Sequence, residues 1–515
     1  MGLISLVIYG IYFLEIRTVT VPEEGGVYRE GSLTQPIYIN PVITNANDTD
    51  KDLIALVYSS LFDLADKITI SKDNKTWTIR LRESVMWHDG TRLTSDDVIF
   101  TIQAMQDPEA RSSLFVTWQG VAIERTSELE LTLTTGAPYA FFEENLKRLY
   151  IMPRHIFETV PVENWRLSNF NLEPIGSGPY RVAGFKKEQN GFISKYILER
   201  NDAFFGKPPY INKIEFNFYV NENDLIRALN TATIDAAAGI NPTRLIDLTR
   251  ARNVYISLLP RYYSVFLNQN ANEILRKYGV RKALLTAIDT EKIIQETFAG
   301  EAAVTVSPVP RELVKDTIAS VYNPAGAEEM LEQMNLPKGE DGVRGNIRLV
   351  IPNVDFLVKT GEIVAASWDA IGIKTELAII DPATVAAEVI RTRNYDAILF
   401  GNVPVSNEDL FSFWHSSERF YPGLNLALWN NKEADRIMER VRKEFDKEVR
   451  TKDLQSLAAL IDKDVPAIFL YSPNYIIVIG NRIKGISIPP NISLPSRRFQ
   501  NISEWYINTQ RTFTK

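Results

Sequence analysis

The sequence predicts a mixed α/β protein of two or three structural units, and its length, composition and order of elements support this prediction. The chain has 515 residues, whereas a single domain typically has about 150. Apolar residues make up 45% and charged residues 23% of the chain, as in globular proteins that bury substantial cores. Strand-like and helix-like segments are interleaved, with no internal repeat and no steady strand–helix alternation. This order is typical of α/β lobes with α+β elaborations.

Half-buried strands are indicated by the alternation of apolar and polar residues. In TWTIRL (Thr76–Leu81), the apolar Trp77, Ile79 and Leu81 alternate with polar residues, which places them on one face of a strand. The same alternation, or a short apolar run between turn residues, predicts further strands. These lie at Glu128–Thr134, Ile211–Val220, Asn346–Pro352, Ile468–Tyr471 and Ile476–Gly480.

Helical segments separate these strands. Apolar residues between Val280 and Ile288 follow i, i+3, i+4, i+7, i+8 spacing, which gives a helix one apolar face. Thr94 and Asp97 form a T-x-x-D variant of the capping box, which predicts that a helix begins near Ser95. Two more helices are predicted, one marked by Ile363–Ile371 and a charged, largely exposed one at Glu433–Glu448.

The first residues differ in character from the rest of the chain. Met1–Leu14 contains no charged residue, and this segment is shorter than the roughly 20 residues that span a bilayer. It also lacks the basic region and the A-x-A-like cleavage site of a secretory signal. We interpret residues 1–21 as a truncated membrane anchor followed by a short tether. The alternative interpretation is a buried N-terminal strand or helix.

Charge and composition exclude several classes of protein. Lys and Arg number 57 against 64 Asp and Glu, a net charge of −7, so nucleic acid is not an expected partner. The chain has no cysteine, which excludes disulfides, thiolate metal sites and cysteine nucleophiles. Its three histidines, His88, His155 and His415, are far apart in the sequence. We therefore predict no metal site and no cofactor.

The W-H-D-G motif (Trp87–Gly90) suggests a catalytic pair, because His88 and Asp89 adjoin. Adjacent side chains point apart, however, and do not orient one another. The Asp89-Gly90 dipeptide is instead predicted to reverse the chain before the helix that begins near Ser95.

The G-S-G-P-Y motif (Gly176–Tyr180) suggests a phosphate loop or a nucleophile elbow. The P-loop lysine is missing, and Pro179 stands where the helix of an elbow should begin. No histidine lies near Ser177 in the sequence. We therefore predict no catalytic residue in this chain.

Five segments of the chain contain recognisable motifs. Their occurrence together, in this order, is more specific evidence than any one motif alone. The longest motif is TWTIRLRESVMWHDGTRLTSDDVIFTIQ, a strand, an aromatic residue before x-D-G, and L-T-x-x-D-V at a helix start. Together the segments resemble the family 5 extracellular solute-binding proteins, the oligopeptide- and dipeptide-binding receptors of ABC importers. The resemblance covers nearly everything after the tether. The segments are Gly25–Leu64, Thr76–Gln103, Glu173–Phe185, Tyr262–Ala302 and Phe413–Val441.

The resemblance implies a class II periplasmic-binding-protein fold, in which two lobes surround a ligand cleft and an additional inserted subdomain enlarges it. By analogy, the first lobe takes residues 22–58, 174–260 and 480–515. The inserted subdomain takes residues 59–173, and the second lobe takes residues 261–479. Two rigid lobes joined by crossing strands can hinge shut on a ligand that contacts both.

The function that the resemblance implies is that of a substrate-binding receptor of an ABC-type importer. Such a receptor captures peptides or similar-sized polar organic solutes by lobe closure and delivers them to a membrane permease. We expect a monomer that is not an enzyme and that works outside the cytoplasm, in the periplasm or at the cell surface. The N-terminal segment would anchor it to the cytoplasmic membrane.

Other functions are compatible with parts of this pattern. A membrane-anchored peptide-binding chaperone or sensor would have the same fold without transport, and a metal-chelate receptor is a variant of the main interpretation. A hydrolase would need carboxylates such as Glu408 and Asp409, but carboxylates at i and i+1 do not by themselves flank a scissile bond.

The resemblance also implies where the ligand binds. In this family the loop after the strand-like YDAILF faces the cleft, and peptide receptors place there an aspartate that neutralises the ligand's α-amino group. Here the first half of the loop has Asn402, Val403 and Pro404, and its acids, Glu408 and Asp409, come later. Because a buried ammonium without a carboxylate is costly, this loop favours sugars, amides or N-blocked ligands over free peptides.

The residues that we predict to contact the ligand combine aromatic surfaces with neutral polar groups, as broad-specificity sites commonly do. Packing in the core is the alternative role for Phe413 and Trp414. The predicted contacts are Tyr38, Asn40, Trp118, Tyr262, Asn268, Asn402, Phe413 and Trp414.

Overall fold

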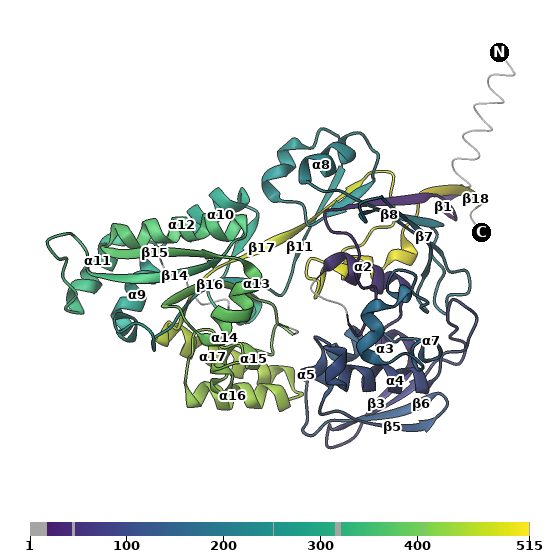
Figure 1. Ribbon diagram of the computed structural model, residues 1–515, viewed down its shortest axis with the longest axis horizontal. Coiled ribbons are helices and arrows are strands. Elements are labelled where there is room, and N and C mark those ends of the chain that lie inside the picture. Colours follow the sequence, from purple (N-terminus) through teal and green to yellow (C-terminus); the bar gives the residue numbers. More distant parts are fainter. Residues whose placement is uncertain (1–17, 44–46, 251, 315–320, 405, 514–515) are drawn as a thin grey trace, which may run out of the picture.

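The computed structural model describes residues 18–43, 47–250, 252–314, 321–404 and 406–513. Within these residues the chain forms a 12-stranded sheet, a 4-stranded sheet and a 2-stranded sheet, with helices packed on them (Figure 1). The mixed α/β architecture predicted from the sequence is therefore confirmed. Met1–Leu14, interpreted above as an anchor, lies outside the described residues.

The large sheet has the strand order β15-β14-β16-β12-β17-β10-β2-β9-β8-β7, and β11 and β13 also pair with β17. Its strands are β2 (Val27–Ser32), β7 (Tyr180–Lys187), β8 (Ile193–Arg200), β9 (Lys213–Phe218), β10 (Ala236–Ala238), β11 (Arg252–Leu258), β12 (Tyr262–Leu267), β13 (Ala302–Val304), β14 (Gly345–Pro352), β15 (Ile373–Ile380), β16 (Ala397–Asn402) and β17 (Ala467–Gly480).

The strand β17 joins two halves of this sheet. Its beginning pairs with β12 and β13, and its end, from Asn474 to Gly480, pairs with β11. Both runs predicted as strands here, Ile468–Tyr471 and Ile476–Gly480, lie in β17, which continues through Pro473 and Asn474 between them. We call β2 and β7–β11 the first half and β12–β16 the second half. Figure 1 shows β17 and β11 running between them.

The second half is covered by helices on both faces. Leu349 and Ile351 of β14 pack in one apolar cluster, whereas Val350 between them packs in another. This alternation is that of a strand buried on both sides. One face carries α9 (Tyr278–Thr286), α10 (Thr290–Phe298), α11 (Pro324–Gln333) and α12 (Asp355–Ala370). The other carries α14 (Ile390–Thr392), α15 (Phe411–Trp414), α16 (Lys432–Lys443) and α17 (Lys447–Asp464), and α13 (Pro382–Thr384) precedes α14.

The helix predicted at Glu433–Glu448 is two helices in the structure. The first, α16, ends at Lys443, and Asp446 then caps α17 by accepting hydrogen bonds from the backbone N–H groups of Glu448 and Val449. Asparagine or aspartate at such a position starts a new helix. The predicted exposure is also wrong in part, because Ile437 and Val441 of α16 are buried.

The 4-stranded sheet is antiparallel, in the order β3-β4-β6-β5. With its helices it forms what we call the small-sheet unit, residues 61–157. In this unit Thr94 and Asp97 make the predicted capping box, and α4 begins at Ser95 as expected. The elements are β3 (Ala65–Ile70), β4 (Thr76–Leu81), β5 (Ala122–Ser127), β6 (Glu130–Thr134), α3 (Leu61–Leu64), α4 (Ser95–Gln106), α5 (Phe115–Trp118), α6 (Phe142–Arg148) and α7 (Arg154–Phe157).

The small-sheet unit and the first half share one apolar core. Trp77 and Leu131 of the small sheet belong to the same buried cluster as Tyr28 and Ile214 of the large sheet. The helices α2 (Asp48–Val57) and α8 (Glu222–Asn230) also pack on the first half. The two parts are therefore packed around one continuous core.

The ends of the described chain meet in the 2-stranded sheet. The strand β1 (Thr18–Glu23) pairs antiparallel with β18 (Asn508–Phe513). Residues 18–21 were expected to belong to a tether, but the alternation in Thr18–Val21 favours a strand, and the structure places them in β1. No helix in the described part of the chain is both long and apolar enough to cross a membrane.

Candidate functional site

Three of the predicted ligand-contacting residues meet in the second half. Tyr262 begins β12 and is the register partner of Asn402, which ends β16. The Tyr262 hydroxyl accepts a hydrogen bond from the Asn402 amide at 3.0 Å and another from the Trp414 indole N–H at 2.9 Å. We call these three residues the Tyr262 cluster. The hydroxyl oxygen of Tyr262 thus binds two residues that lie 140 and 152 positions away from Tyr262 in the chain.

The Tyr262 cluster is buried and uncharged. Burial raises the pKa of the Tyr262 hydroxyl above its usual range, although the hydrogen bonds from Asn402 and Trp414 act in the opposite direction. The ring of Phe469 lies 5.8 Å from that of Tyr262 and 5.6 Å from that of Trp414. Aromatic contacts of this kind fix the polar groups in position. The cluster is therefore a neutral, internally hydrogen-bonded group that aromatic packing holds in place.

The residues beside this cluster differ in exposure. Val403 follows Asn402 directly and is 58% exposed. Phe413, on α15, is only partly buried and packs against the second-half core. The accessible surface at the end of β16 is thus apolar, with the neutral cluster behind it.

Tyr38 lies in the first half and is partly buried against its core. The carboxylate of Asp50 accepts hydrogen bonds from the backbone N–H groups of Ile37 and Tyr38, at 2.7 and 3.0 Å. The guanidinium of Arg166 lies 5.3 Å from the centre of the Tyr38 ring. These contacts hold Tyr38 rigidly, beside an exposed Ile37.

The other three predicted contacts are not brought to this surface. Asn40, Trp118 and Asn268 are all buried. The Asn40 side chain accepts from the backbone N–H groups of Val42 and Ile43, which fixes the turn after it. Such satisfied buried groups have structural roles.

Trp118 and Asn268 are enclosed by their own surroundings. The Trp118 ring packs 5.7 Å from that of Phe142 inside the small-sheet unit. The Asn268 amide donates to the backbone carbonyls of Arg393 and Tyr395. Asn40, Trp118 and Asn268 are thus as buried as Tyr262, Asn402 and Trp414, but they do not join the Tyr262 cluster.

The two acids of the loop after β16 are both paired with arginines. Glu408 lies 2.9 Å from Nε of Arg450, and Asp409 lies 3.1 Å from Nε of Arg442. Both pairs are largely shielded from solvent. Neither carboxylate is free to neutralise a ligand's ammonium group, which agrees with the neutral character of the Tyr262 cluster.

The W-H-D-G segment is a turn, as predicted. Gly90 has a φ of +86°, which favours glycine, and its N–H donates to the carbonyl of Trp87. His88 accepts the N–H of Gly176 at Nδ1 and donates from Nε2 to the carbonyl of Gly178, at 3.2 and 3.1 Å. Burial lowers the pKa of His88 to about 4. His88 therefore tethers the small-sheet unit to the G-S-G segment in its neutral form.

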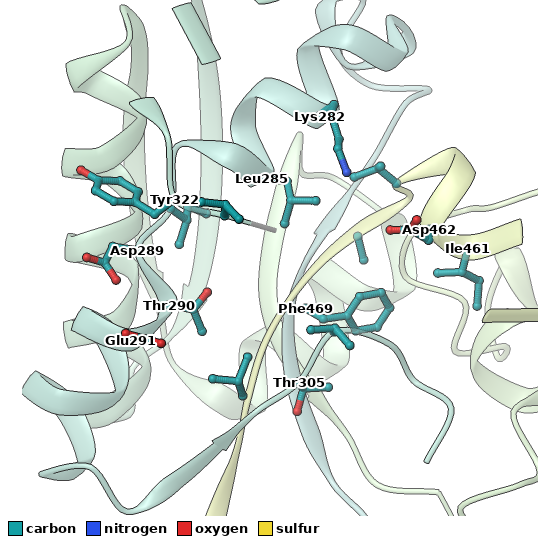
Figure 2. Close-up of a pocket in the computed structure, with 16 residues that line it drawn as sticks. Lys282, Leu285, Asp289, Thr290, Glu291, Thr305, Tyr322, Ile461, Asp462 and Phe469 are labelled. Atoms are coloured by element: carbon teal, nitrogen blue, oxygen red, sulfur yellow. The ribbon is translucent and has the colours of Figure 1, made fainter. Parts of the chain in front are cut away.

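The structure contains two hollows that the Tyr262 cluster itself does not line. One, of about 450 Å³, is in the second half, and Figure 2 shows Asp289 and Glu291 on one side of it and Lys282 and Asp462 on the other. Its wall includes Phe469, the ring that packs against Tyr262.

The other hollow, of about 480 Å³, is more open and lies beside His88 and Arg181. None of the predicted ligand-contacting residues lines either hollow. In the described part of the chain, no group of three or more His, Cys, Asp and Glu residues is placed to hold a metal ion.

Sequence reasoning missed a second polar cluster. Tyr139 and Phe141, from the small-sheet unit, contact Asp409, Arg442 and Arg450 of the second half. The only signal in the sequence is the aromatic run PYAFF at residues 138–142, and nothing in it indicates the distant arginines.

Comparisons with known proteins agree with this architecture. The model of the family described as bacterial extracellular solute-binding proteins, family 5 Middle, matches residues 62–420. The oligopeptide-binding protein AppA of Bacillus subtilis is 25% identical over 520 residues, which cover 94% of this chain and 92% of AppA.

Solved structures show the same fold. The structure of Bacillus subtilis AppA with a nonapeptide has a TM-score of 0.74 and 23% identity, and covers 95% of this chain and 100% of that one. The structure of NikZ from Campylobacter jejuni with Ni(L-His) has a TM-score of 0.75 and 24% identity, and covers 93% of this chain and 99% of that one. The fold is thus the predicted class II periplasmic-binding-protein fold, with two lobes around a ligand cleft and an additional inserted subdomain. This protein belongs to the family 5 bacterial extracellular solute-binding proteins.

Proposed function

We propose that this protein is the substrate-binding receptor of an ABC-type importer, which captures peptides or similar-sized polar organic solutes by lobe closure and delivers them to a membrane permease. The observation that carries this proposal is the way the two halves are joined. The strand β17 and the turn between β11 and β12 connect two bodies, each with its own main core. Bodies joined in this way can hinge about the connecting strands.

The relatives support this reading of the cleft. One is named an oligopeptide-binding protein, and its solved structure holds a nonapeptide. Another solved structure, of a peptide-binding relative from Helicobacter pylori, holds the peptide STSA. Because this chain spans nearly the full length of both, the same mode of capture is our proposal for it.

The lobes of the proposed receptor follow the predicted division. The first lobe takes residues 22–58, 174–260 and 480–515, the inserted subdomain 59–173, and the second lobe 261–479. This division is supported by the small sheet, whose strands all lie within residues 59–173. It is also supported by β17, which crosses between the halves just before residue 480.

We propose that the ligand lies between Tyr38 of the first lobe and Tyr262, Asn402, Phe413 and Trp414 of the second. The ligand end at Asn402 is neutral, because the acids of the neighbouring loop are paired with arginines. Sugars, amides and N-blocked peptides meet this requirement, whereas a free α-ammonium group would be buried without a counterion.

The family is one of extracellular binding proteins, so the receptor works outside the cytoplasm. We propose that Met1–Leu14 anchors it to the cytoplasmic membrane, that it is a monomer, and that it returns its ligand chemically unchanged. Its partners on this proposal are the ligand and the permease subunits of the importer.

A binding experiment on the full chain tests this function. The chain is titrated with a pool of short peptides, half of them N-acetylated, while the melting temperature and the masses of the recovered peptides are measured. We expect a higher melting temperature and unchanged peptide masses. Cleaved peptides would identify a hydrolase instead. Stimulation of the ATPase of a permease partner by the loaded chain would distinguish a transport receptor from a chaperone or sensor, which would not stimulate it.

A further inference from the structure

The small-sheet unit touches the second half at a point remote from the crossing strands. Ala140, between β6 and α6, donates its backbone N–H to the carbonyl of Arg442 on α16 at 2.8 Å. Beside it, the Tyr139 hydroxyl donates to the carboxylate of Asp409 at 2.7 Å. The same carboxylate oxygen is 3.1 Å from Nε of Arg442. In Figure 1 the crossing strands β17 and β11 lie above this region, and α16 and α5 approach each other below.

The polar contact is enclosed by aromatic rings. The guanidinium of Arg442 lies 4.4 Å from the ring centre of Phe411 and 5.2 Å from that of Tyr139. Burial, followed by the charge of Asp409, raises the pKa of Tyr139, so its hydroxyl remains a donor. A hydrogen bond to a charged group in such an environment is stronger than one at the surface.

Each of the two bodies also inserts an aromatic side chain into the core of the other. Phe141 of the small-sheet unit is 5% exposed and belongs to the core of the second half. Arg450, paired with Glu408, lies 5.4 Å from its ring centre. In return Phe445, between α16 and α17, packs against the core of the first half and small-sheet unit. The contact therefore buries apolar surface on both bodies.

Opening of the lobes would break this contact. The small-sheet unit shares one core with the first half, so it moves with the first lobe. Rotation of the second lobe about β17 and β11 would separate Tyr139 from Asp409 and withdraw Phe141 and Phe445 into solvent. Each exposed aromatic ring costs free energy in proportion to its area.

We propose that Tyr139, Ala140 and Phe141, together with Asp409, Arg442 and Phe445, form a latch that holds the lobes closed without ligand contact. A ligand shifts a conformational equilibrium only by its differential affinity for the two states. The latch adds a second contribution to the free-energy difference between the open and closed conformations. Like the ligand, it favours the closed conformation, but it acts before any ligand binds. The unliganded receptor therefore populates the closed conformation, and the ligand enters through a minor open state.

The absence of cysteine makes a direct test simple. Glu124, on β5, and Lys432, at the start of α16, are both exposed, and each is replaced by cysteine and spin-labelled in the full chain. Distances between the labels are measured by pulsed electron paramagnetic resonance on the unliganded protein, whose mass verifies that it is empty. We expect one dominant short distance.

Two variants then weaken the latch. Tyr139→Phe removes only the hydrogen bond to Asp409, and we expect the ratio of closed to open molecules to fall about tenfold. Phe141→Ala removes buried apolar surface, and we expect a fall of at least the same size. Tyr278→Phe changes an exposed tyrosine of α9 and is the matched control, for which we expect no change.

The outcomes decide the proposal. A longer distance that appears with Tyr139→Phe or Phe141→Ala, but not with Tyr278→Phe, supports the latch. A long distance that dominates in the unsubstituted, empty chain overturns it, and so do distances that remain unchanged in both latch variants. Because no ligand is present, these results are independent of the proposed transport function.

Discussion

A methyl group added to Gly176 would lie 1.9 Å from the backbone carbonyl oxygen of Val57. Gly178 is similarly close, because a Cβ there would lie 2.6 Å from the carbonyl oxygen of Leu56. The G-S-G segment thus passes directly against the end of α2, where the backbone of Gly178 donates to the carbonyl of Val57. These glycines serve close packing of two backbones, and the resemblance to a phosphate loop has no chemical meaning.

We expect Gly176→Ala to lower the free energy of unfolding by about 3 kcal/mol, because the atoms that it meets belong to the backbone and cannot move aside. The measurement is urea unfolding followed by circular dichroism. Gly136→Ala is the control, since no atom lies within 4 Å of its added methyl group, and we expect a change below about 0.5 kcal/mol. Equal stability of the two variants would contradict this packing.

The buried His88 makes stability depend on pH. Burial lowers its pKa from 6.5 to about 4, and Arg181 adds to this, whereas Asp89 and the bond to Gly178 oppose it. The unfolded chain therefore binds a proton between pH 6.5 and 4 that the folded chain does not. The stability from neutral His88 is complete above pH 6.5 and is lost as the pH falls to 4, by about 3 kcal/mol.

The comparison of the native chain with His88→Gln isolates this group. Urea unfolding at pH 7, 5.5 and 4.5 should give a smaller decrease in stability for the variant than for the native chain. Parallel decreases would show that His88 does not carry the effect.

The side chain of Arg498 is buried between two carboxylates. It makes two bonds to Asp52, at 2.5 and 2.7 Å, and one to Glu30 at 3.1 Å. We expect Arg498→Met to lower the free energy of unfolding by about 3 to 5 kcal/mol, because both carboxylates would remain buried without a cation. Arg181→Met removes an exposed pair with Glu199 and should cost less than about 1 kcal/mol. The free energy of unfolding of both variants is measured by urea unfolding. Similar decreases in the two variants would contradict this prediction.

The neutral character of the site is tested by adding a charge. Asn402→Asp places a carboxylate in the Tyr262 cluster, where the Tyr262 hydroxyl can donate to it. We expect affinity for free peptides to rise about tenfold relative to the same peptides after N-acetylation, as measured by calorimetry. Asn407→Asp makes the same change at an exposed position of the loop and should leave the ratio unchanged. No gain with Asn402→Asp would remove the explanation based on the missing carboxylate.

Most of the fold could be predicted because local patterns and family motifs agree. The alternation in Thr76–Leu81 and Lys213–Phe218 gave strands in the right places, and Thr94 and Asp97 marked the start of α4. The continuity of β17 could not be predicted, because it depends on partners from β10 to β13 that continue the ladder past Pro473.

The site was predictable only in part, since residue type indicates chemistry but not accessibility. Tyr262, Asn402 and Trp414 do meet, although no sequence pattern links them. Asn268 and Trp118 have equally suitable side chains, but they lie away from the Tyr262 cluster, packed against other partners. The pairing of Asp409 with Arg442 could not be foreseen either, because it depends on the packing of α16 against the loop.

The central claim, that the chain is a receptor for peptides or similar polar solutes, is tested most directly by native mass spectrometry of the full chain purified without denaturation. The account predicts additional mass that is released on activation as short peptides or as one polar solute of similar size. An empty chain that also fails to bind any member of a mixed peptide and solute pool would contradict it.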